Sequence, residues 1–311
     1  MTTGVVLMTY GSPRDLDDVG AYITRVRGGR APEAELLTEF KRRYTRIGMS
    51  PLIGITHQQA AALGKVLGAA FRVRAGMRFS EPSIATAVGE LGDVDRVLGL
   101  ILSPQYSATL MGGYHQALTQ AAGDTPCRTV EAWHLNPAFI DMLASRIRAA
   151  LAQFPDSLRD EVPVLLTAHS LPRRVVDREP GYVEQLRETA HEVARAAELG
   201  SHRWFFVYQS AGHTPEEWLK PDMLDVLPEL AAAGHRDVVV APVQFLADHL
   251  ETLYDVDVAG REQAEAAGFS RFMRISAPNA APDFIDALAS VVRGELAAWE
   301  RAAQGARWAT V

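Results

Sequence analysis

The chain has 311 residues, a formal net charge of −7 at pH 7 and a single cysteine, Cys127. The length suits two packed units, and the acidic charge argues against nucleic acid as the main partner, since binding phosphates needs a basic face. One cysteine excludes a disulfide framework, a cysteine-ligated zinc site and an iron–sulfur cluster held by this chain alone.

The first residues run directly into an apolar strand, without the charged and cleavable segments of a leader peptide. No apolar run approaches the ~20 residues that cross a bilayer. We therefore expect a cytoplasmic protein with no transmembrane segment, whose membrane contact, if any, is peripheral.

Strands and helices are expected to alternate along the first half. Thr56 is the predicted N-cap of the third helix. The predicted strands cover residues 4–10, 71–79, 94–102 and 129–132, and the predicted helices cover 15–26, 33–47, 56–67, 81–91 and 136–151, with one more around Tyr114.

The second half repeats this alternation. It indicates an α/β protein with two doubly wound, Rossmann-like units and a cleft between them. We place the domains at 1–155 and 156–311, with a helix at 282–303 closing the second domain and a frayed tail after Gln304. The predicted strands are 163–168, 204–208, 238–243 and 272–275, and the other predicted helices are 182–199, 222–233 and 248–266.

The apolar run at 162–168 is typical of a buried central strand. It carries His169 and Ser170 to its carboxyl end, where Pro172 stops the ladder. Ligands of open α/β sheets bind beyond this edge, and an imidazole there can take a proton or bind a metal. The alternative is a loop histidine that only forms structural hydrogen bonds.

A second polar stretch, 248–255, follows another apolar strand. In a helix, Asp248, Glu251 and Asp255 would share one face at i, i+3 and i+7. Together with His169 they would offer one nitrogen and up to three oxygens, which suits a labile divalent metal. The alternative is a capping box, because an acidic pair three residues apart also suits a helix N-terminus.

Tyr10 ends the first strand and should face the same cleft, although a strand-end tyrosine can equally serve packing. The turn after it, Gly11-Ser12-Pro13, lacks the three glycines of a dinucleotide loop, which argues against a nicotinamide cofactor. A basic group nearby could clamp carboxylates through bidentate pairs, or could be solvated surface charge: Arg27, Arg30, Arg42 and Arg43, with Tyr44.

Motifs along the whole chain resemble, in order, those of the ferrochelatase family, of the bacterial coproporphyrin III type. The ordered set is highly specific, above all AHSLP followed by DHLETLYD. The motifs are TYGSP near residue 10, RRYTRIGMSPL at 42–52, SPQYS at 103–107, TAHSLP at 167–172, YQSAGHTPEEWLKPD at 208–222, PVQFLADHLETLYDVD at 242–257 and PNAAPDFIDAL at 278–288.

The resemblance implies roles for individual residues. His169 and Glu251 would face the metal-entry side of a porphyrin, and Tyr10, on the opposite side, would be the axial ligand of the product iron. Porphyrin contacts, several through propionates, are implied for Arg27, Arg43, Tyr44, Ser50 and Tyr114.

The chain departs from the family pattern at one position. Similar chains often carry a carboxylate where this chain has Ala259. The outer acidic line that leads metal toward Glu251 is therefore reduced to Asp255, Asp257 and Glu262, with Asp255 as the outer metal position.

The implied activity is insertion of ferrous iron into coproporphyrin III to form coproheme in haem biosynthesis. Porphyrin and Fe²⁺ are then substrates, no cofactor is tightly bound, and we expect a monomer that makes transient contacts with neighbouring enzymes of the haem pathway. Three alternatives stay open: a protoporphyrin IX ferrochelatase, a non-catalytic haem or porphyrin carrier of the same fold, and a cobalt chelatase of the corrinoid pathways.

Overall fold

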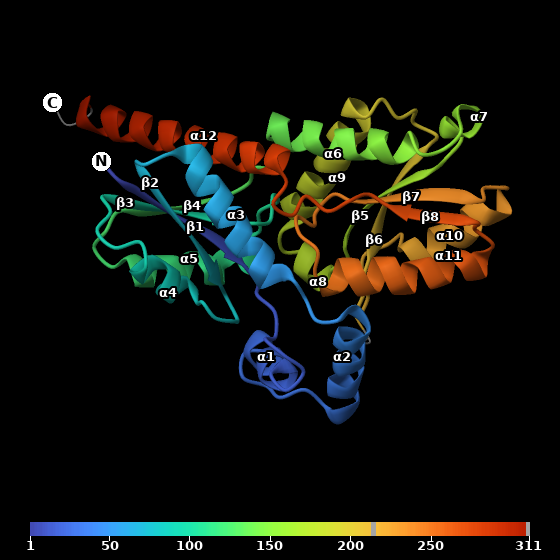
Figure 1. Ribbon diagram of the computed structural model, residues 1–311, viewed down its shortest axis with the longest axis horizontal. Helices are drawn as coiled ribbons and strands as arrows, with labels where there is room; N and C mark the ends of the chain where they lie inside the picture. Colours follow the sequence, from blue (N-terminus) through green and yellow to red (C-terminus); the bar gives the residue numbers. More distant parts are fainter. Residues whose placement is uncertain (213–215, 309–311) are drawn as a thin grey trace.

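Two four-stranded parallel sheets form the frame of the protein (Figure 1). The computed structural model describes residues 1–212 and 216–308. The first sheet has the order β2-β1-β3-β4 and the second β6-β5-β7-β8, so the predicted α/β class with two doubly wound units is confirmed. The strands are β1 (Thr3–Thr9), β2 (Phe71–Met77), β3 (Arg96–Ile101), β4 (Cys127–Val130), β5 (Val164–His169), β6 (Trp204–Gln209), β7 (Asp237–Pro242) and β8 (Arg271–Arg274).

The first strand of each half is central in its sheet and almost wholly buried. All residues of β1 are buried, and so are all residues of β5 before His169. Helices cover both faces of each sheet, which is why these strands are apolar runs without polar alternation. Polar side chains can reach solvent only beyond the strand ends, which concentrates chemistry there.

The two sheets repeat one hydrogen-bonding pattern. The amide that follows β3 donates to the carbonyl of Met8 (2.9 Å), and the amide that follows β7 donates to the carbonyl of Thr167 (3.0 Å). Tyr10 and His169 each lie two residues further along their strands. They therefore occupy equivalent positions, one at the strand-order reversal of each sheet, where ligands of such folds bind.

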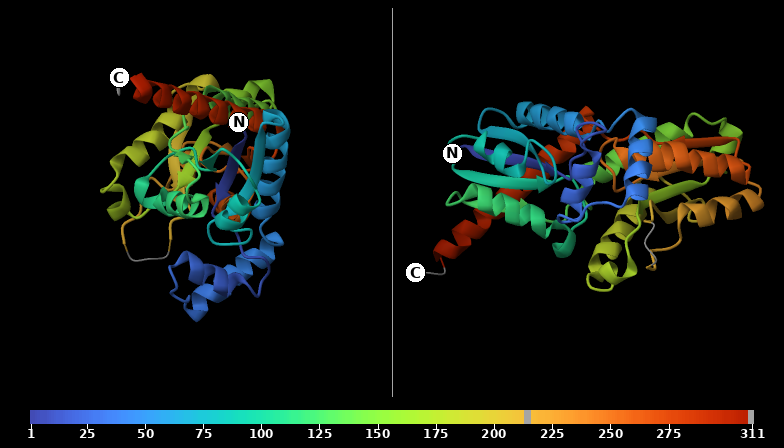
Figure 2. Two further views of the ribbon diagram at one scale, coloured as in Figure 1. Left: turned by 90° about the vertical axis from the view of Figure 1, so that its left-hand side faces the viewer. Right: turned by 90° about the horizontal axis from the view of Figure 1, so that it is seen from below.

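Of the helices before β5, α3, α4 and α5 pack against the strands of the first sheet, and α1 and α2 build a separate lobe. Helices α1 and α2 project away from both sheets (Figures 1 and 2). The bounds are α1 (Val19–Val26), α2 (Ala34–Ile47), α3 (Leu52–Leu67), α4 (Ile84–Gly89), α5 (Ala108–Ala122), α6 (Pro137–Leu151) and the short α7 (Asp156–Arg159).

The later helices include one unusual element. Helix η1 is a π-helix, in which the Arg261 amide reaches back five residues to the carbonyl of Val256. The bounds are α8 (Arg173–Val176), α9 (Pro180–Ala196), α10 (Met223–Ala232), η1 (Glu251–Gly260), α11 (Arg261–Ala267) and α12 (Pro282–Trp308).

Two long helices cross between the halves. Helix α6 packs against α9 and β7 of the second half, and α12 runs back across the first half, beside α3 (Figure 1). Arg96 of β3 pairs with Glu300 of α12 at 2.9 Å. All strands of the first sheet precede residue 155, and all strands of the second sheet follow it. Helix α12, although it ends the second half of the sequence, packs over the first half.

Four predicted helix starts are wrong by three residues or more. The predicted helix 81–91 begins at Ile84, because the Ser83 side chain caps it by accepting from the Thr86 amide. Helix α3 begins at Leu52, and Thr56, the predicted cap, is buried inside it with its hydroxyl donating to the Leu52 carbonyl. The predicted helix 15–26 begins only at Val19, because the Asp15 carboxylate accepts the next amides and holds a turn. The predicted helix 248–266 begins at Glu251 and is a π-helix for its first ten residues.

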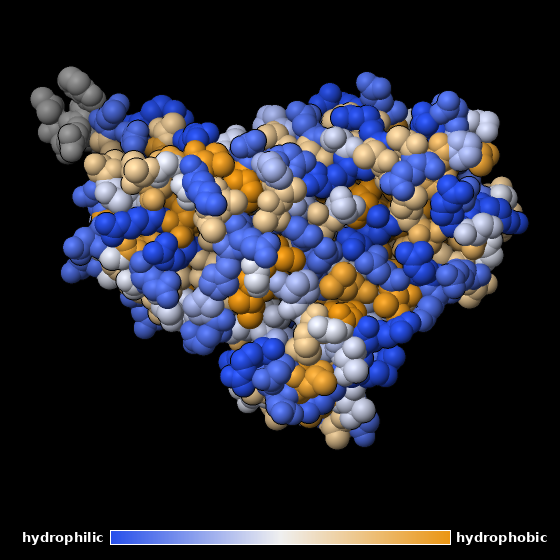
Figure 3. All heavy atoms as spheres, viewed as in Figure 1, coloured by the Kyte–Doolittle hydropathy of each residue, from blue (hydrophilic) through white to orange (hydrophobic). Residues whose placement is uncertain are grey.

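The face of the molecule in Figure 3 is largely polar. Figure 3 shows hydrophilic residues across the whole face in view, with apolar residues in scattered groups. Among the residues that the structure describes, none of the helices combines the length and apolar character of a membrane-spanning segment.

Candidate active site

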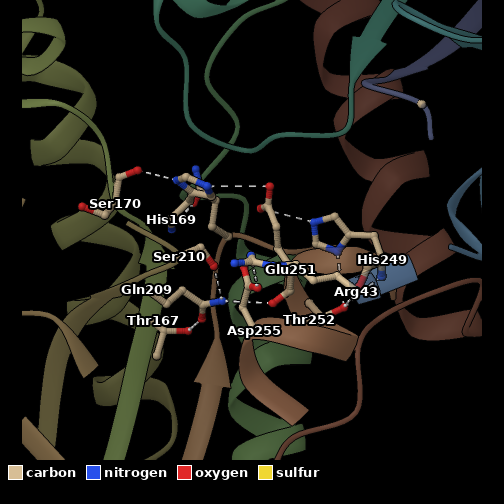
Figure 4. Close-up of polar contacts among 12 residues, drawn as sticks. Arg43, Thr167, His169, Ser170, Gln209, Ser210, His249, Glu251, Thr252 and Asp255 are labelled. Carbon is tan, nitrogen blue, oxygen red and sulfur yellow. Dashed lines mark hydrogen bonds and ion pairs between the residues drawn. The ribbon is translucent and has the colours of Figure 1, made fainter. Parts of the chain in front are cut away.

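His169 is held at the end of β5 by its backbone and its ring (Figure 4). Its amide donates to the side-chain carbonyl of Gln244 at 2.8 Å. Its Nδ1 contacts the carbonyl oxygen of Ser170. A carbonyl only accepts, so Nδ1 carries the proton, and the neutral imidazole presents the lone pair of Nε2. That nitrogen faces Glu251.

Glu251 lies between two imidazoles. One carboxylate oxygen is 3.7 Å from Nε2 of His169, and the other is 3.6 Å from Nε2 of His249. Figure 4 shows the carboxylate pointing between the two rings. The second histidine, His249, was missed from the sequence, although it lies two residues before Glu251 in the same polar stretch.

The electrostatics of this trio favour the ionised carboxylate. Burial by itself raises the pKa of Glu251, but the charge of His169 and the hydrogen bond and charge of His249 outweigh it and lower the pKa to about 2. Glu251 is therefore a carboxylate at every pH at which the protein would work.

Side chains from three strands fix the start of η1. The Gln209 amide donates to the Glu251 carbonyl at 3.4 Å, and its oxygen accepts from the Thr167 hydroxyl. On the other side, Arg274 of β8 donates to Asp248 (3.0 Å) and Asp257 (2.8 Å). These contacts hold the polypeptide on both sides of Glu251.

The predicted four-group metal cluster is wrong in one member. Asp248 precedes η1 and turns toward Arg274 and Asn279, away from His169. Its side chain caps nothing either, because η1 has no side-chain cap. Among the described residues there is no group of three or more His, Cys, Asp or Glu side chains arranged to hold a metal ion. His169 and Glu251 are the predicted pair that the structure brings together.

Asp255 lies one π turn beyond Glu251 and contacts Arg43. Nη1 of Arg43 is 3.3 Å from its carboxylate, and Nε of Arg43 is 2.8 Å from Glu39. Burial raises the pKa of Asp255, a hydrogen bond from Ser210 lowers it, and the charge of Glu251 raises it. Beyond this pair, Ala259 packs among the apolar side chains of the lobe and Asp257 is held by Arg274.

Tyr10 lies at the corresponding position in the first half and is 44% exposed. Its ring meets Phe79 edge-on at 4.7 Å. Desolvation by the surrounding protein raises the pKa of the Tyr10 phenol, Arg78 lowers it, and the charge of Glu251 raises it. Arg78, which sequence reasoning also missed, stacks over Tyr114 at 5.2 Å.

The remaining predicted contacts divide into buried phenols and lobe residues. Tyr44 and Tyr114 are 3% and 5% exposed, and burial raises the pKa of both. Burial likewise raises the pKa of Tyr22, whose hydroxyl donates to the carbonyl of Gly11, the residue after Tyr10, at 3.0 Å.

Arg27 and Ser50 already have partners on the lobe. Arg27 pairs with Glu33 at 3.0 Å. The Ser50 hydroxyl accepts from the Leu52 amide at 3.4 Å, at the start of α3. The motif at 208–222 passes through residues 213–215, which lie outside the described residues.

Solved structures share this fold at low sequence identity. SirB from Bacillus subtilis, solved with Fe³⁺, aligns with a TM-score of 0.56 at 11% identity, over 94% of this chain and 95% of that one. CbiX, described as the terminal enzyme of siroheme biosynthesis in denitrifying bacteria, aligns with a TM-score of 0.53 at 15% identity, over 94% and 99%. The architecture is thus that of a two-unit chelatase fold.

The sequence comparison narrows this class. The chain belongs to the ferrochelatase family, whose model matches residues 2–296, and is thus an enzyme that inserts metal into a porphyrin. It is 39% identical to a ferrochelatase of Herpetosiphon aurantiacus, over 94% of this chain and 99% of that protein. It is 38% identical to the coproporphyrin III ferrochelatase of Geobacillus kaustophilus (94% and 95%) and 35% identical to that of Bacillus subtilis (94% and 97%).

Replacing His249 with Asn should raise the pKa of Glu251, because a positive charge and a hydrogen bond are lost while burial persists. Titration of the side-chain carboxyls by ¹³C NMR, with the signal assigned through Glu251→Gln, measures this directly. In the wild type the carboxyl should titrate near 2.

The same shift sets the sign of a stability effect. A folded-state pKa below the ordinary 4.5 means that ionised Glu251 stabilises the fold above pH 4.5, and that this contribution is lost as pH falls toward about 2. The difference in unfolding free energy between wild type and Glu251→Gln should shrink over that interval. A carboxyl that titrates near 4.5 in both wild type and His249→Asn would contradict this account.

Proposed function

We propose that this protein inserts Fe²⁺ into coproporphyrin III and releases coproheme. The observation that carries the proposal is the imidazole–carboxylate pair of His169 and Glu251, with Tyr10 at the equivalent strand end of the other sheet. Relatives named coproporphyrin III ferrochelatases, aligned over nearly their whole length, support the choice of substrate.

His169 is the proposed acceptor of pyrrole protons. Metal insertion must remove two such protons, and a histidine has a reference pKa of about 6.5, which leaves it largely neutral at pH 7. The contact of Nδ1 with a carbonyl leaves Nε2 as the basic atom. Once protonated, Nε2 faces the Glu251 carboxylate, which stabilises the imidazolium.

Glu251 is the proposed partner for both proton and metal. Its lowered pKa keeps it anionic, so it can attract Fe²⁺ and hand it on without first losing a proton. Imidazole and carboxylate ligands bind Fe²⁺ and release it, whereas thiolates would retain soft metals. Asp255 is proposed as an outer feeder position, with its negative charge moderated by Arg43.

The product iron is proposed to take Tyr10 as its axial ligand, on the porphyrin face opposite His169. The support is geometric: the two residues occupy equivalent strand ends in separate sheets, and the Tyr10 ring packs against Phe79 of its own half. Desolvation raises the pKa of the Tyr10 phenol and Arg78 only partly offsets this, so binding to the iron would itself have to drive loss of the phenolic proton.

We further propose that iron is a substrate and that the protein holds neither a resident cofactor nor an iron–sulfur cluster. We propose a cytoplasmic monomer that meets neighbouring haem-pathway enzymes transiently. Metal analysis of the purified protein tests whether it holds a resident metal or cluster. Sedimentation velocity tests whether it is a monomer, and a stable dimer would contradict that proposal.

Coproporphyrin III should be preferred to protoporphyrin IX, because it carries four propionates instead of two. Each charge-assisted hydrogen bond contributes about 1.5–3 kcal/mol, less at an exposed mouth, so we expect at least about a tenfold higher kcat/KM, the ratio equivalent to ~1.4 kcal/mol. Anaerobic assays with both porphyrins and Fe²⁺ measure it. Equal kcat/KM values would favour a protoporphyrin enzyme or surface arginines without a substrate role.

His169→Ala should lower turnover by about 10²–10⁴-fold, the usual contribution of a general base, and leave porphyrin affinity nearly unchanged. Glu251→Gln should also be slow, and the double variant should be little slower than the worse single one, because the two groups act as a unit. His191→Ala, on the exposed face of α9, is the matched control. Multiplicative losses would mean independent roles, and a His169→Ala enzyme as fast as wild type would exclude the proposed base.

Tyr10→Phe should change the absorption spectrum of bound coproheme, because a phenolate ligand to iron is lost, while affinity for metal-free porphyrin changes less than threefold or so. Tyr106→Phe provides a control on the same half of the chain. A product spectrum identical in wild type and Tyr10→Phe would show that the phenol only packs against Phe79.

A further inference from the structure

A hollow lies on the outer side of the second sheet, separate from the site described above. β6 is an edge strand, and its alternate residues Trp204, Phe206 and Tyr208 point to one face. Together with side chains of α9 they line a space of about 390 Å³. Gln209, the next residue, points to the opposite face and holds Glu251.

The fold does not require this hollow, because the other half fills it. The Met77 amide of β2 donates to the carbonyl of Pro82, as the Tyr208 amide of β6 donates to Pro221, so Met77 and Tyr208 are equivalent. In the first half this face is packed against α3 and wholly buried, with Val73, Ala75 and Met77 7%, 3% and 1% exposed.

Helix α9 does not cover β6 in the same way. It packs mainly on α6, beside which it lies in Figure 1. Trp204 and Phe206 of β6 are only half-buried. The three aromatic side chains of β6 thus occupy the positions of Val73, Ala75 and Met77 in the first half. Despite their size, they do not fill the space between β6 and α9. An aromatic surface of this kind beside open space is typical of ligand sites.

A buried polar group faces the hollow without a full set of partners. Tyr208 is 1% exposed, and no hydrogen bond of regular geometry reaches its hydroxyl within the described ranges. Arg187 lies beside it, but a guanidinium only donates. The phenolic proton therefore has no acceptor among these residues, a condition that costs free energy in the absence of a ligand.

The rim is cationic. Arg187 is exposed and makes no ion pair among the described residues. His191 lies on the same face of α9, with its ring 6.3 Å from that of Trp204. Lys220 also borders the hollow, but Asp225 neutralises it at 2.6 Å. The free charge at the rim is thus that of Arg187, with His191 adding to it when protonated.

We propose that this hollow is a second ligand site, specific for a small planar aromatic carboxylate. The aromatic ring would lie against Trp204 and Phe206. The carboxylate would accept the proton of Tyr208 and a charge-assisted hydrogen bond from Arg187. The volume suits a ligand of one or two fused rings and lies at the lower end of the range of small-molecule sites.

The probe is 1-naphthoate, titrated calorimetrically into the full-length protein. We expect one molecule bound per chain. Its neutral analogue 1-naphthalenemethanol and the variant Arg187→Gln should each weaken binding by about tenfold, since one charge-assisted hydrogen bond is worth at least ~1.4 kcal/mol. Tyr208→Phe should weaken it severalfold and, because it removes an unpaired proton donor, should leave the melting temperature unchanged or raised.

Two controls locate the binding. Arg195→Gln alters the same helix α9 at a residue paired with Glu192 and should bind 1-naphthoate like the wild type. Arg43→Gln alters the proposed porphyrin side and should also have no effect. No binding, equal binding of acid and alcohol, or a loss in Arg43→Gln instead of Arg187→Gln would each overturn the proposal, whether or not the protein metallates coproporphyrin.

Discussion

The contact on which the rest of this site depends is that between the Glu251 carboxylate and the two imidazoles at either side of it. A carboxylate away from solvent is unfavourable unless positive charge or hydrogen bonds compensate for it. His169 and His249 supply this compensation, so the same contact that stabilises the partly buried charge also places a basic nitrogen beside an anionic oxygen. The groups proposed for proton removal and metal transfer thus also stabilise one another, and the surrounding scaffold has to keep the two imidazoles 3.7 and 3.6 Å from the carboxylate.

That scaffold comes from two copies of one strand pattern. Because β1 and β5 take the same place in sheets of the same order, Tyr10 and His169, each two residues beyond a carbonyl bonded from the end of the neighbouring strand, are equivalent in topology and different in chemistry. A flat molecule between the two strand ends would present one face to a phenol and the other to an imidazole. Two related halves would in this way offer one ligand two different axial environments.

The sequence predicted the parts that depend on local pattern and missed those that depend on distant partners. Apolar runs without alternation located nearly all the strands, and strand ends then identified His169. Asp248 was assigned to the metal face because an α-helix was assumed, but Arg274, 26 residues away, holds it elsewhere. The π-helix has no pattern of its own in the sequence, so the approach of His249 to Glu251 could not be derived from α-helical spacing. Thr56 was predicted to be a cap because a threonine before an apolar run is typical of one. Its burial follows from the packing of α3 on β2 and α12, which the local sequence does not show.

One arginine of the lobe, Arg43, would link porphyrin binding to the proposed metal side. Arg43 contacts Glu39 on its own helix and Asp255 on η1, and it stacks over Tyr254 at 5.1 Å. A propionate that accepts a hydrogen bond from Arg43 must share it with, or displace, a carboxylate that is already bound. The binding free energy gained is therefore smaller than it would be with a hydrated, unpaired arginine. The exchange also has a direction: moving Arg43 away from Asp255 would remove the cation that compensates this carboxylate, and the uncompensated charge would attract Fe²⁺ more strongly. Porphyrin binding at the lobe would then prepare the metal path toward Glu251, because one guanidinium serves both.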